Sequence, residues 1–217
     1  NGLKPVISIY SSFYQRGYDQ VIHDICMQNL PVVMCVDRAG IVGNDGETHQ
    51  GLLDMASFSI VPNIAILAPK DFNELEQMMD FAVNYNAPIL IRYPRGGEGS
   101  VKFSNTSKIE LGKSEIIKQG SDLTIIAIGK MVEKAMQVAE EFSKLDIDVE
   151  VINARFLKPF DNEKVLESIE KTRNVITIED GILRSGLATT VNELIIKNKI
   201  LDVHIENFGY DDKFVKH

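Results

Sequence analysis

The sequence contains little cysteine. Only Cys26 and Cys35 occur among its 217 residues, and both lie in apolar stretches with no second pair nearby. Disulfide frameworks and zinc sites need several cysteines, or cysteines with histidines, at close spacing. Neither kind of site is therefore expected to organise this protein, and we expect both thiols to be buried as small hydrophobic groups.

Runs of positive charge and long apolar runs are also missing. The formal net charge is -8, and Lys and Arg form no cluster along the chain. A nucleic-acid surface needs such clusters to neutralise phosphates, so none is expected. No apolar run approaches the roughly 20 residues that a membrane helix requires, and no basic and apolar leader opens the chain. These absences favour a cytoplasmic protein that binds neither nucleic acid nor a membrane.

The composition is that of a folded protein. Hydrophobic residues make up 44% and charged residues 25% of the chain, which suits a globular fold with an ordinary core. The length allows either two domains of roughly 100 residues or one larger domain. The chain begins with a turn that leads directly into a strand, without an initiator Met. We therefore expect it to be a fragment of a longer protein.

Up to residue 92 the chain alternates short β-branched runs with segments of helical period. This alternation is typical of βαβ units around a parallel sheet. Strands are expected at 6–10, 32–36, 64–68 and 89–92, and their continuous apolarity suits strands covered on both faces. Apolar residues at 18, 21, 22 and 25, and at 75, 78, 79 and 82 after a start near Asp71, predict helices between them.

A glycine-rich stretch then interrupts the pattern, and positions 95–108 are expected to form a linker. A second α/β block follows, with strands expected at 123–128, 149–153, 175–179 and 203–208 and helices at 132–145, 162–172 and 187–197. No internal repeat of fixed period is present. The pattern thus predicts an α/β protein of two three-layer domains.

Ligands of open parallel sheets gather at the carboxyl ends of strands, so the loops that follow strands are the first places to search. One such loop runs from Tyr10 to Arg16, and a second from Asp37 to Gly51. The second combines four glycines with arginine, histidine and carboxylates. Glycines let a backbone approach a ligand, arginine holds anions, and histidine moves protons near neutral pH. Alone these residues are weak evidence, because a loop histidine or an Asp-Gly pair is commonly structural.

The segment from Asp37 to Gly51 reads DRAGIVGNDGETHQG and resembles the signature of the deoxyxylulose-phosphate synthases. The wider transketolase family shares only its Asp-Gly-x-Thr-His-Gln portion. Supporting matches are IYS at 9–11, YDQ at 18–20, RYPRG at 92–96 and FLKP at 156–159, so the likeness covers nearly the whole chain. The resemblance implies a transketolase-type pyrimidine-binding domain at 1–97, truncated at its start, and a transketolase C-terminal domain at 109–217.

The resemblance also implies cofactor contacts at the first loop. Phe13 would stack on the aminopyrimidine ring of thiamine diphosphate, with core packing as the alternative. Tyr10 would shape the substrate pocket, unless it is merely structural. Arg16 would bind the cofactor, although it could instead pair with Asp19 or Asp37.

Substrate recognition is implied for the second loop and its neighbour. Arg38 and Arg95 would hold the phosphate of D-glyceraldehyde 3-phosphate, with surface salt bridges as the alternative. Asp45 would accept a hydrogen bond from a substrate hydroxyl, or else cap a turn. His49 would be catalytic, donating to the aldehyde or carboxylate oxygen as charge develops.

The family's reaction condenses pyruvate with D-glyceraldehyde 3-phosphate to 1-deoxy-D-xylulose 5-phosphate and CO2, for isoprenoid, thiamine and pyridoxal biosynthesis. Members hold the diphosphate through Mg2+ on a Gly-Asp-Gly motif followed by Asn, and this chain has no such pair. The glutamate that activates the cofactor would lie before its first residue. The resemblance therefore implies no metal site in this chain, a homodimer, and no activity of the chain by itself.

Two other hypotheses remain open from the sequence. The chain could belong to a sugar transketolase or to a 2-oxo acid dehydrogenase β subunit, although the 38–43 stretch disfavours both. It could also be an assembly module that serves dimerisation. In the second block, the segment Gly129-Lys130 opens a helix whose N-terminus could hold an anion, but structural roles and dimer contacts are expected there instead. The loop at Glu179-Asp180-Gly181 is expected to serve an interface.

Overall fold

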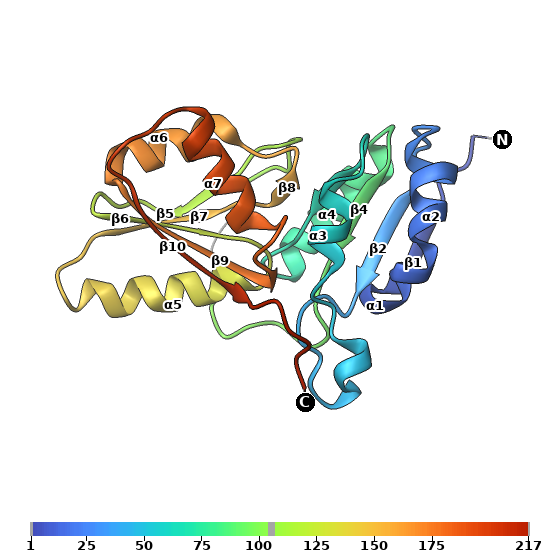
Figure 1. Ribbon diagram of the computed structural model, residues 1–217, viewed down its shortest axis with the longest axis horizontal. Coiled ribbons are helices and arrows are strands. Elements are labelled where there is room, and N and C mark those ends of the chain that lie inside the picture. The colour runs from blue at the N-terminus through green and yellow to red at the C-terminus, as the bar shows by residue number, and fades with distance from the viewer. Residues whose placement is uncertain (1, 104–106, 217) are drawn as a thin grey trace.

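The computed structural model describes residues 2–103 and 107–216. These residues form two α/β blocks, each built around a five-stranded sheet, and Figure 1 shows the blocks packed against each other. The expected fold class is confirmed. The expected linker at 95–108 is only partly visible, since positions 104–106 lie outside the described residues, as do the chain ends at 1 and 217.

The first sheet has the strand order β1-β2-β4-β3-β8. Its first four members are β1 (Val6–Tyr10), β2 (Val33–Asp37), β3 (Ala65–Leu67) and β4 (Ile89–Arg92). All pairings among these four are parallel. β3 and β4 are wholly buried, which explains their unbroken apolar sequences. The carboxyl ends of these parallel strands meet at one edge of the sheet.

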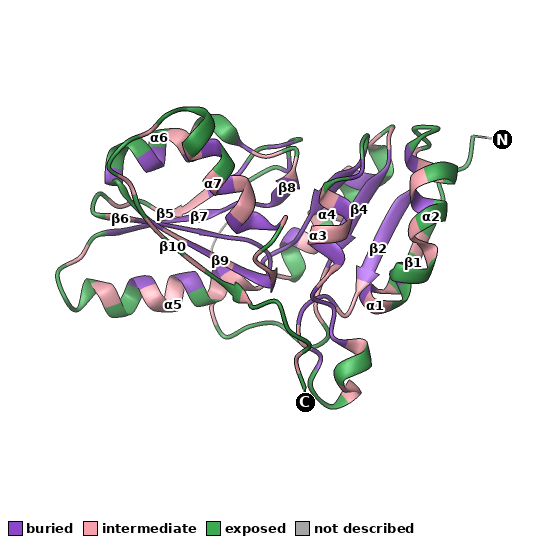
Figure 2. Cartoon of the chain, in the orientation of Figure 1, coloured by how far each residue is buried: buried purple, intermediate pink, exposed green. Residues whose placement is uncertain are grey.

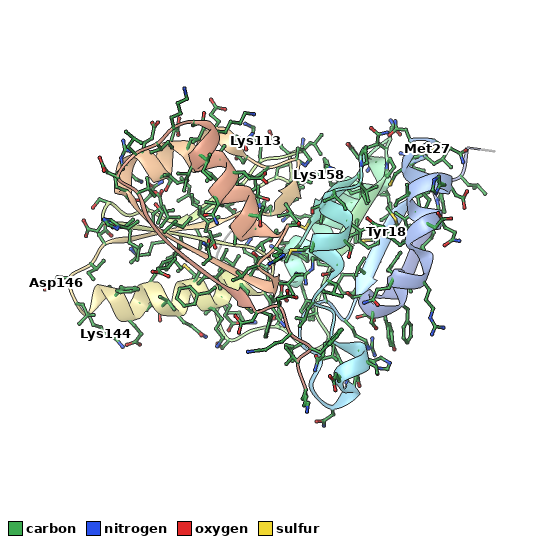
Figure 3. All side chains as sticks on the ribbon, in the orientation of Figure 1. Tyr18, Met27, Lys113, Lys144, Asp146 and Lys158 are labelled. Carbon is green, nitrogen blue, oxygen red and sulfur yellow. The ribbon has the colours of Figure 1, made fainter. Side chains whose placement is uncertain are left out.

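The fifth strand of this sheet comes from the other half of the chain. β8 (Phe156–Lys158) pairs antiparallel with β3, placing Lys158 opposite Ile66. Lys158 lies where the two blocks meet (Figure 3), and its Nζ donates to the carbonyl of Ser59 at 2.9 Å. From the sequence, this segment is expected to belong to the second block. A strand of three residues carries too little pattern to reveal its partner.

Helical segments cover both faces of the first sheet. They are α1 (Ser11–Tyr14), the 3-10 turn η1 (Gln15–Gly17), α2 (Tyr18–Gln20), the π-helical η2 (Val21–Cys26), α3 (Asp54–Ser59) and α4 (Phe72–Asn84). α4 begins as expected, since the Asp71 side chain accepts from the Glu74 amide at 2.7 Å. Tyr18 points toward α3 (Figure 3) and donates to the carbonyl of Ser57 at 2.8 Å. The short helix α3 was not anticipated.

The second sheet has the order β10-β9-β6-β7-β5, with β5 antiparallel to β7. Its strands are β5 (Glu115–Lys118), β6 (Leu123–Ala127), β7 (Val149–Asn153), β9 (Asn174–Ile182) and β10 (His204–Tyr210). Helices α6 (Asn162–Thr172) and α7 (Leu187–Lys197) lie on one face and α5 (Met131–Ser143) on the other (Figure 1). The strand β5 was not anticipated, and β9 extends further than 175–179.

Burial follows this layering. Figure 2 shows buried strands between helices whose outer faces are exposed. The expected stripes are core, as Met78 and Ala82 on α4 show by being fully buried. Both cysteines are buried and free, as expected. Within residues 2–103 and 107–216, every helix is too short or too polar to cross a bilayer.

The carboxyl end of the second sheet packs against the first block. Arg155, which follows β7, is 1% exposed and donates from Nε to Glu74 on α4 at 2.7 Å. Asn153 donates to the same carboxylate at 2.9 Å, and Lys70 pairs with it at 3.1 Å. Such a buried carboxylate is tolerated only because several donors satisfy it. This network fixes the two blocks in place relative to each other.

Candidate functional site

The loop after β2, from Asp37 to Gly51, projects from the carboxyl end of the first sheet (Figure 1). Two 3-10 turns, η3 (Gly43–Asp45) and η4 (Glu47–His49), shape its tip. Its neck is closed by reciprocal backbone hydrogen bonds between Gly40 and Gly51 at 2.7 and 2.8 Å. A Cβ at Gly51 would collide with the carbonyl of Arg38 and with Ser11. Glycine is required there because the two strands of the neck approach so closely.

Two arginines converge on one carboxylate in this loop. The Nε of Arg38 lies 3.4 Å from Asp45, and the Nη1 of Arg95 donates to the other oxygen of the same carboxylate. Arg38 also pairs with Asp37 at 2.5 Å. The side chains of Arg38 and Asp45 are 21% and 26% exposed, and that of Arg95 is 48% exposed. Arg38 from the loop and Arg95 from the segment after β4 thus place two cationic groups around one carboxylate.

Arg38 has an unusual backbone. Its φ is +59°, in the left-handed region that few non-glycine residues adopt. This conformation places the guanidinium carbon 3.7 Å from the centre of the Tyr10 ring. Backbone strain of this kind costs on the order of 1 kcal/mol and is concentrated at functional sites. Arg38 thus combines a left-handed backbone with a guanidinium that lies over the Tyr10 ring.

An aromatic group completes the cluster. Tyr10 at the end of β1 and Phe13 on α1 stack with ring centroids 5.3 Å apart and an interplanar angle of 16°. The His49 ring meets Phe13 edge-on at 5.4 Å and Tyr10 at 6.4 Å. Its Nδ1 lies 3.0 Å from the Thr48 hydroxyl. Phe13 is 50% exposed, so its ring lies on an open surface and outside the core.

Six of the seven residues singled out in the sequence therefore lie together: Tyr10, Phe13, Arg38, Asp45, His49 and Arg95. Arg16 on η1 is exposed, and in the described part of the chain no contact joins it to this cluster. Asp19 pairs with His23 at 2.8 Å, and Asp37 with Arg38, so neither carboxylate serves Arg16. A cofactor contact by Arg16 stays a prediction.

A buried ion network supports the cluster. Arg92, at the end of β4, donates from Nε to Asp54 at 2.9 Å and from Nη1 to Asp180 at 2.5 Å. Lys130 approaches Asp180 at 3.5 Å. Burial opposes the charge of Asp180, but Arg92 and Lys130 outweigh it and hold the pKa of that carboxyl below its ordinary value. From the sequence, Asp180 is expected to have only an interface role. The feature that could have indicated a buried ion pair is its position as a charged residue at the end of an apolar strand.

Glu179 beside it has the opposite character. This carboxyl is 2% exposed and accepts from the amides of Leu187 and Ala188, at 3.0 and 2.8 Å, where α7 begins. Burial raises its pKa to about 7, despite the opposing effects of these two amides and of Arg92. Within residues 2–103 and 107–216, this region included, no group of three or more His, Cys, Asp or Glu is arranged to hold a metal ion.

Two family models match the chain, the transketolase pyrimidine binding domain over residues 1–97 and the transketolase C-terminal domain over residues 112–217. The chain belongs to the transketolase family. Among members of this family, it is 46% identical over 217 residues to a 1-deoxy-D-xylulose-5-phosphate synthase of Halothermothrix orenii. It is 47% identical over 219 residues to one of Clostridium perfringens.

These matches confirm the resemblance that the sequence motifs indicate. Each covers 100% of this chain but only 34% and 35% of the relatives, so the chain spans about a third of their length. A solved transketolase structure described as "Split gene transketolase, inactive beta4 tetramer" is 29% identical with a TM-score of 0.89. That likeness covers 98% of this chain and 69% of the solved one.

Proposed function

We propose that this chain provides the aminopyrimidine- and phosphate-recognising part of a thiamine-diphosphate-dependent transferase of two-carbon units. Its reaction is the condensation of pyruvate with D-glyceraldehyde 3-phosphate to 1-deoxy-D-xylulose 5-phosphate and CO2. Similarity to synthases of that name over the whole chain supports the proposal. The product would feed isoprenoid, thiamine and pyridoxal biosynthesis.

The observation that carries the proposal is the convergence of Arg38 and Arg95 on Asp45. Two planar guanidinium groups can share a phosphate dianion through several charge-assisted hydrogen bonds, which a single lysine could not orient. The Asp45 carboxylate between them would accept from a hydroxyl of the same substrate. A sugar phosphate is therefore the ligand class that this set of side chains suits best.

The aromatic cluster fits the ring of the cofactor. Phe13 presents a half-exposed flat face beside His49, and stacking on such a face fixes the plane of an aminopyrimidine. When bound, thiamine diphosphate would accommodate the negative charge left as pyruvate loses CO2. His49 would donate a hydrogen bond to the substrate oxygen on which charge develops. Tyr10 would limit the space available to the substrate.

The remaining parts of the proposal concern groups outside this chain. We expect the diphosphate and its Mg2+ to be held by residues that this chain does not contain, so the chain alone should be inactive. Pyrimidine-binding and C-terminal domains at 1–97 and 109–217, a homodimeric assembly and a cytoplasmic location complete the proposal.

The proposal is tested in the full-length protein with Arg38→Ala and Arg95→Ala. Loss of a charge-assisted contact costs about 1.5–3 kcal/mol, so the KM for D-glyceraldehyde 3-phosphate should rise roughly 10- to 100-fold in each variant. The KM for pyruvate should change much less. The matched control is Arg173→Ala. Arg173 follows the last residue of α6 and precedes the first residue of β9, at the end of that strand far from Asp180. Equal changes for both substrates would exclude the phosphate role.

A different reaction within the family is separated by its products. Pyruvate with glyceraldehyde phosphate should give deoxyxylulose phosphate, whereas a sugar transketolase would use ribose phosphate with xylulose phosphate. Turnover of the second pair alone would overturn the proposed substrates.

A second candidate function is that of a separately encoded subunit that acts only with a partner chain. The likeness to the split-gene transketolase structure, described as an inactive tetramer, favours it. Gene context decides between the candidates. A Gly-Asp-Gly motif and an activating glutamate in the same reading frame support a single-chain synthase, and their presence in a neighbouring gene supports a subunit.

A further inference from the structure

The neck of the site loop packs against the end of β9 in the second block. The amide of Ile182 donates to the carbonyl of Leu52 at 3.1 Å, directly after the loop ends. A Cβ at Gly181 would lie 2.9 Å from Met55. A Cβ at Gly40 would strike the carboxylate of Asp180. Both ends of the loop therefore pack against residues 180–182 without space for a side chain.

The charge at this place ties three segments together. Asp180 is 2% exposed and pairs with Arg92, which pairs in turn with Asp54, three residues after the end of the loop. Tyr93, which follows Arg92, accepts from the amide of Ala39 at 3.0 Å where the loop begins. Arg95 lies three residues beyond Arg92. Arg92 is thus linked through its guanidinium to the end of the loop, through the neighbouring Tyr93 to its start, and through the segment after β4 to Arg95.

We infer that Asp180 is a positioning residue for the candidate site: through Arg92 it holds both ends of the Asp37–Gly51 loop, so that the second block sets the placing of Arg38 and Asp45 relative to Arg95. This inference rests on the proposed function for its kinetic consequence. Asp180 touches no substrate in this arrangement, since it lies beneath the neck of the loop. Lys130 approaches the other oxygen of the Asp180 carboxylate at 3.5 Å.

The physical reason is the cost of an unmatched buried charge. Without the Asp180 charge, Arg92 keeps only Asp54 as a carboxylate partner and must either stay under-neutralised or move toward solvent. Movement of Arg92 would shift the end of β4 and the neck of the loop with it. The site should then lose its order while the two sheets remain folded, because the Arg155 network still joins the blocks.

The test uses the full-length protein and the variant Asp180→Asn, which keeps the size of the side chain. Hydrogen exchange of amides 37–51 should become at least tenfold faster than in the wild type. The KM for D-glyceraldehyde 3-phosphate should rise about tenfold, with a smaller change for pyruvate. The control is Glu150→Gln, which removes another buried carboxylate of the second block, paired with Lys171 at 2.5 Å. It should leave exchange in the loop and both KM values unchanged.

Gly40→Ala is a second variant for the case that Asp180→Asn fails to fold. The added methyl group would collide with the Asp180 carboxylate and changes no charge. Exchange of amides 37–51 and the KM for D-glyceraldehyde 3-phosphate should therefore change in the same direction as in Asp180→Asn. The inference is overturned if a folded variant exchanges amides 37–51 at the wild-type rate. It is also overturned if these amides exchange faster while the KM for D-glyceraldehyde 3-phosphate stays unchanged. The arginine variants test the proposed function separately, because an effect of Arg38→Ala on KM does not depend on Asp180.

Discussion

The carboxyl ends of the two sheets differ in what covers them. In the first sheet, side chains from the segments after β1 and β4 reach an open surface, where Phe13 is 50% and the Arg95 side chain 48% exposed. In the second sheet, the residues after β7 and at the end of β9 are enclosed by the first block, where Arg155 and Asp180 are 1% and 2% exposed. Both edges carry arginines and carboxylates. The open edge is where we propose that the ligand binds.

The difference shows how a general rule of α/β proteins should be applied. Ligands gather at the carboxyl ends of parallel strands, but a neighbouring domain can occupy that edge instead. Charges at the covered edge then serve the contact between domains. Loss of Arg155 at the covered edge should therefore lower stability, loss of Asp180 there should act on the site only through the loop, and variants at the open edge should lower activity directly.

The largest expected effect is that of Arg155→Ala at the covered edge. Its removal leaves Glu74 buried with fewer donors, which should lower the free energy of unfolding by about 3 kcal/mol. This loss is at the lower end of the roughly 3–5 kcal/mol expected when a buried ion pair is broken, because Lys70 still pairs with Glu74. Denaturant unfolding followed by circular dichroism measures the change. A loss below about 1 kcal/mol would show that the network does not hold the blocks together.

A pH-dependent effect is expected at Glu179. Its pKa is about 7 in the folded chain and near 4.5 in the unfolded chain, so the folded state binds the extra proton between these values. Stability from Glu179 is present below pH 4.5 and is lost as the pH rises through 7. The stability of the wild type relative to Glu179→Gln should fall by on the order of 2 kcal/mol between pH 5 and pH 8. A constant difference in urea unfolding across this range would contradict the prediction.

At the open edge, His49→Ala should spare stability and reduce turnover. The ring makes contacts with Phe13 and Tyr10 on an open surface, so the free energy of unfolding should change by less than about 1 kcal/mol. Loss of a donor to developing charge typically costs about 100-fold in turnover. Steady-state kinetics of the full-length protein, beside thermal unfolding, measures both. A collapsed thermal transition would instead assign His49 a structural role.

The smallest effect is expected far from either edge, at Lys144→Ala. Lys144 pairs with Glu141 at 2.6 Å at the outer end of α5 (Figure 3), and both side chains are mostly exposed. Exposed pairs of this type contribute about 0.5 kcal/mol or less. Unfolding midpoints should therefore coincide with the wild type within that limit. A larger loss of unfolding free energy would mean that the exposure of a side chain does not indicate how much its ion pair contributes to stability.

Sequence patterns predicted several elements well. The expected bounds of β1, β4, β7, α6 and α7 are those observed, because the helices have an apolar period and the strands are runs rich in β-branched and apolar residues. β5, β8 and α3 were missed, because these short segments mix polar and apolar residues without a clear pattern. The residues of the site came from a motif resemblance, and spacing alone would have left His49 and Asp45 as ordinary loop residues. The pairing of Arg92 with Asp180 joins distant segments, which local patterns do not reveal.

The strand β8 has a consequence for how the chain is made. Because β8 is the edge strand that pairs with β3, the first sheet cannot be completed until residue 158 has left the ribosome. Until then β3 presents an unpaired edge of buried apolar residues, a surface prone to join strands of other chains. Dividing this protein between its two sheets would make that exposure permanent, so the halves depend on each other for solubility as well as for shape.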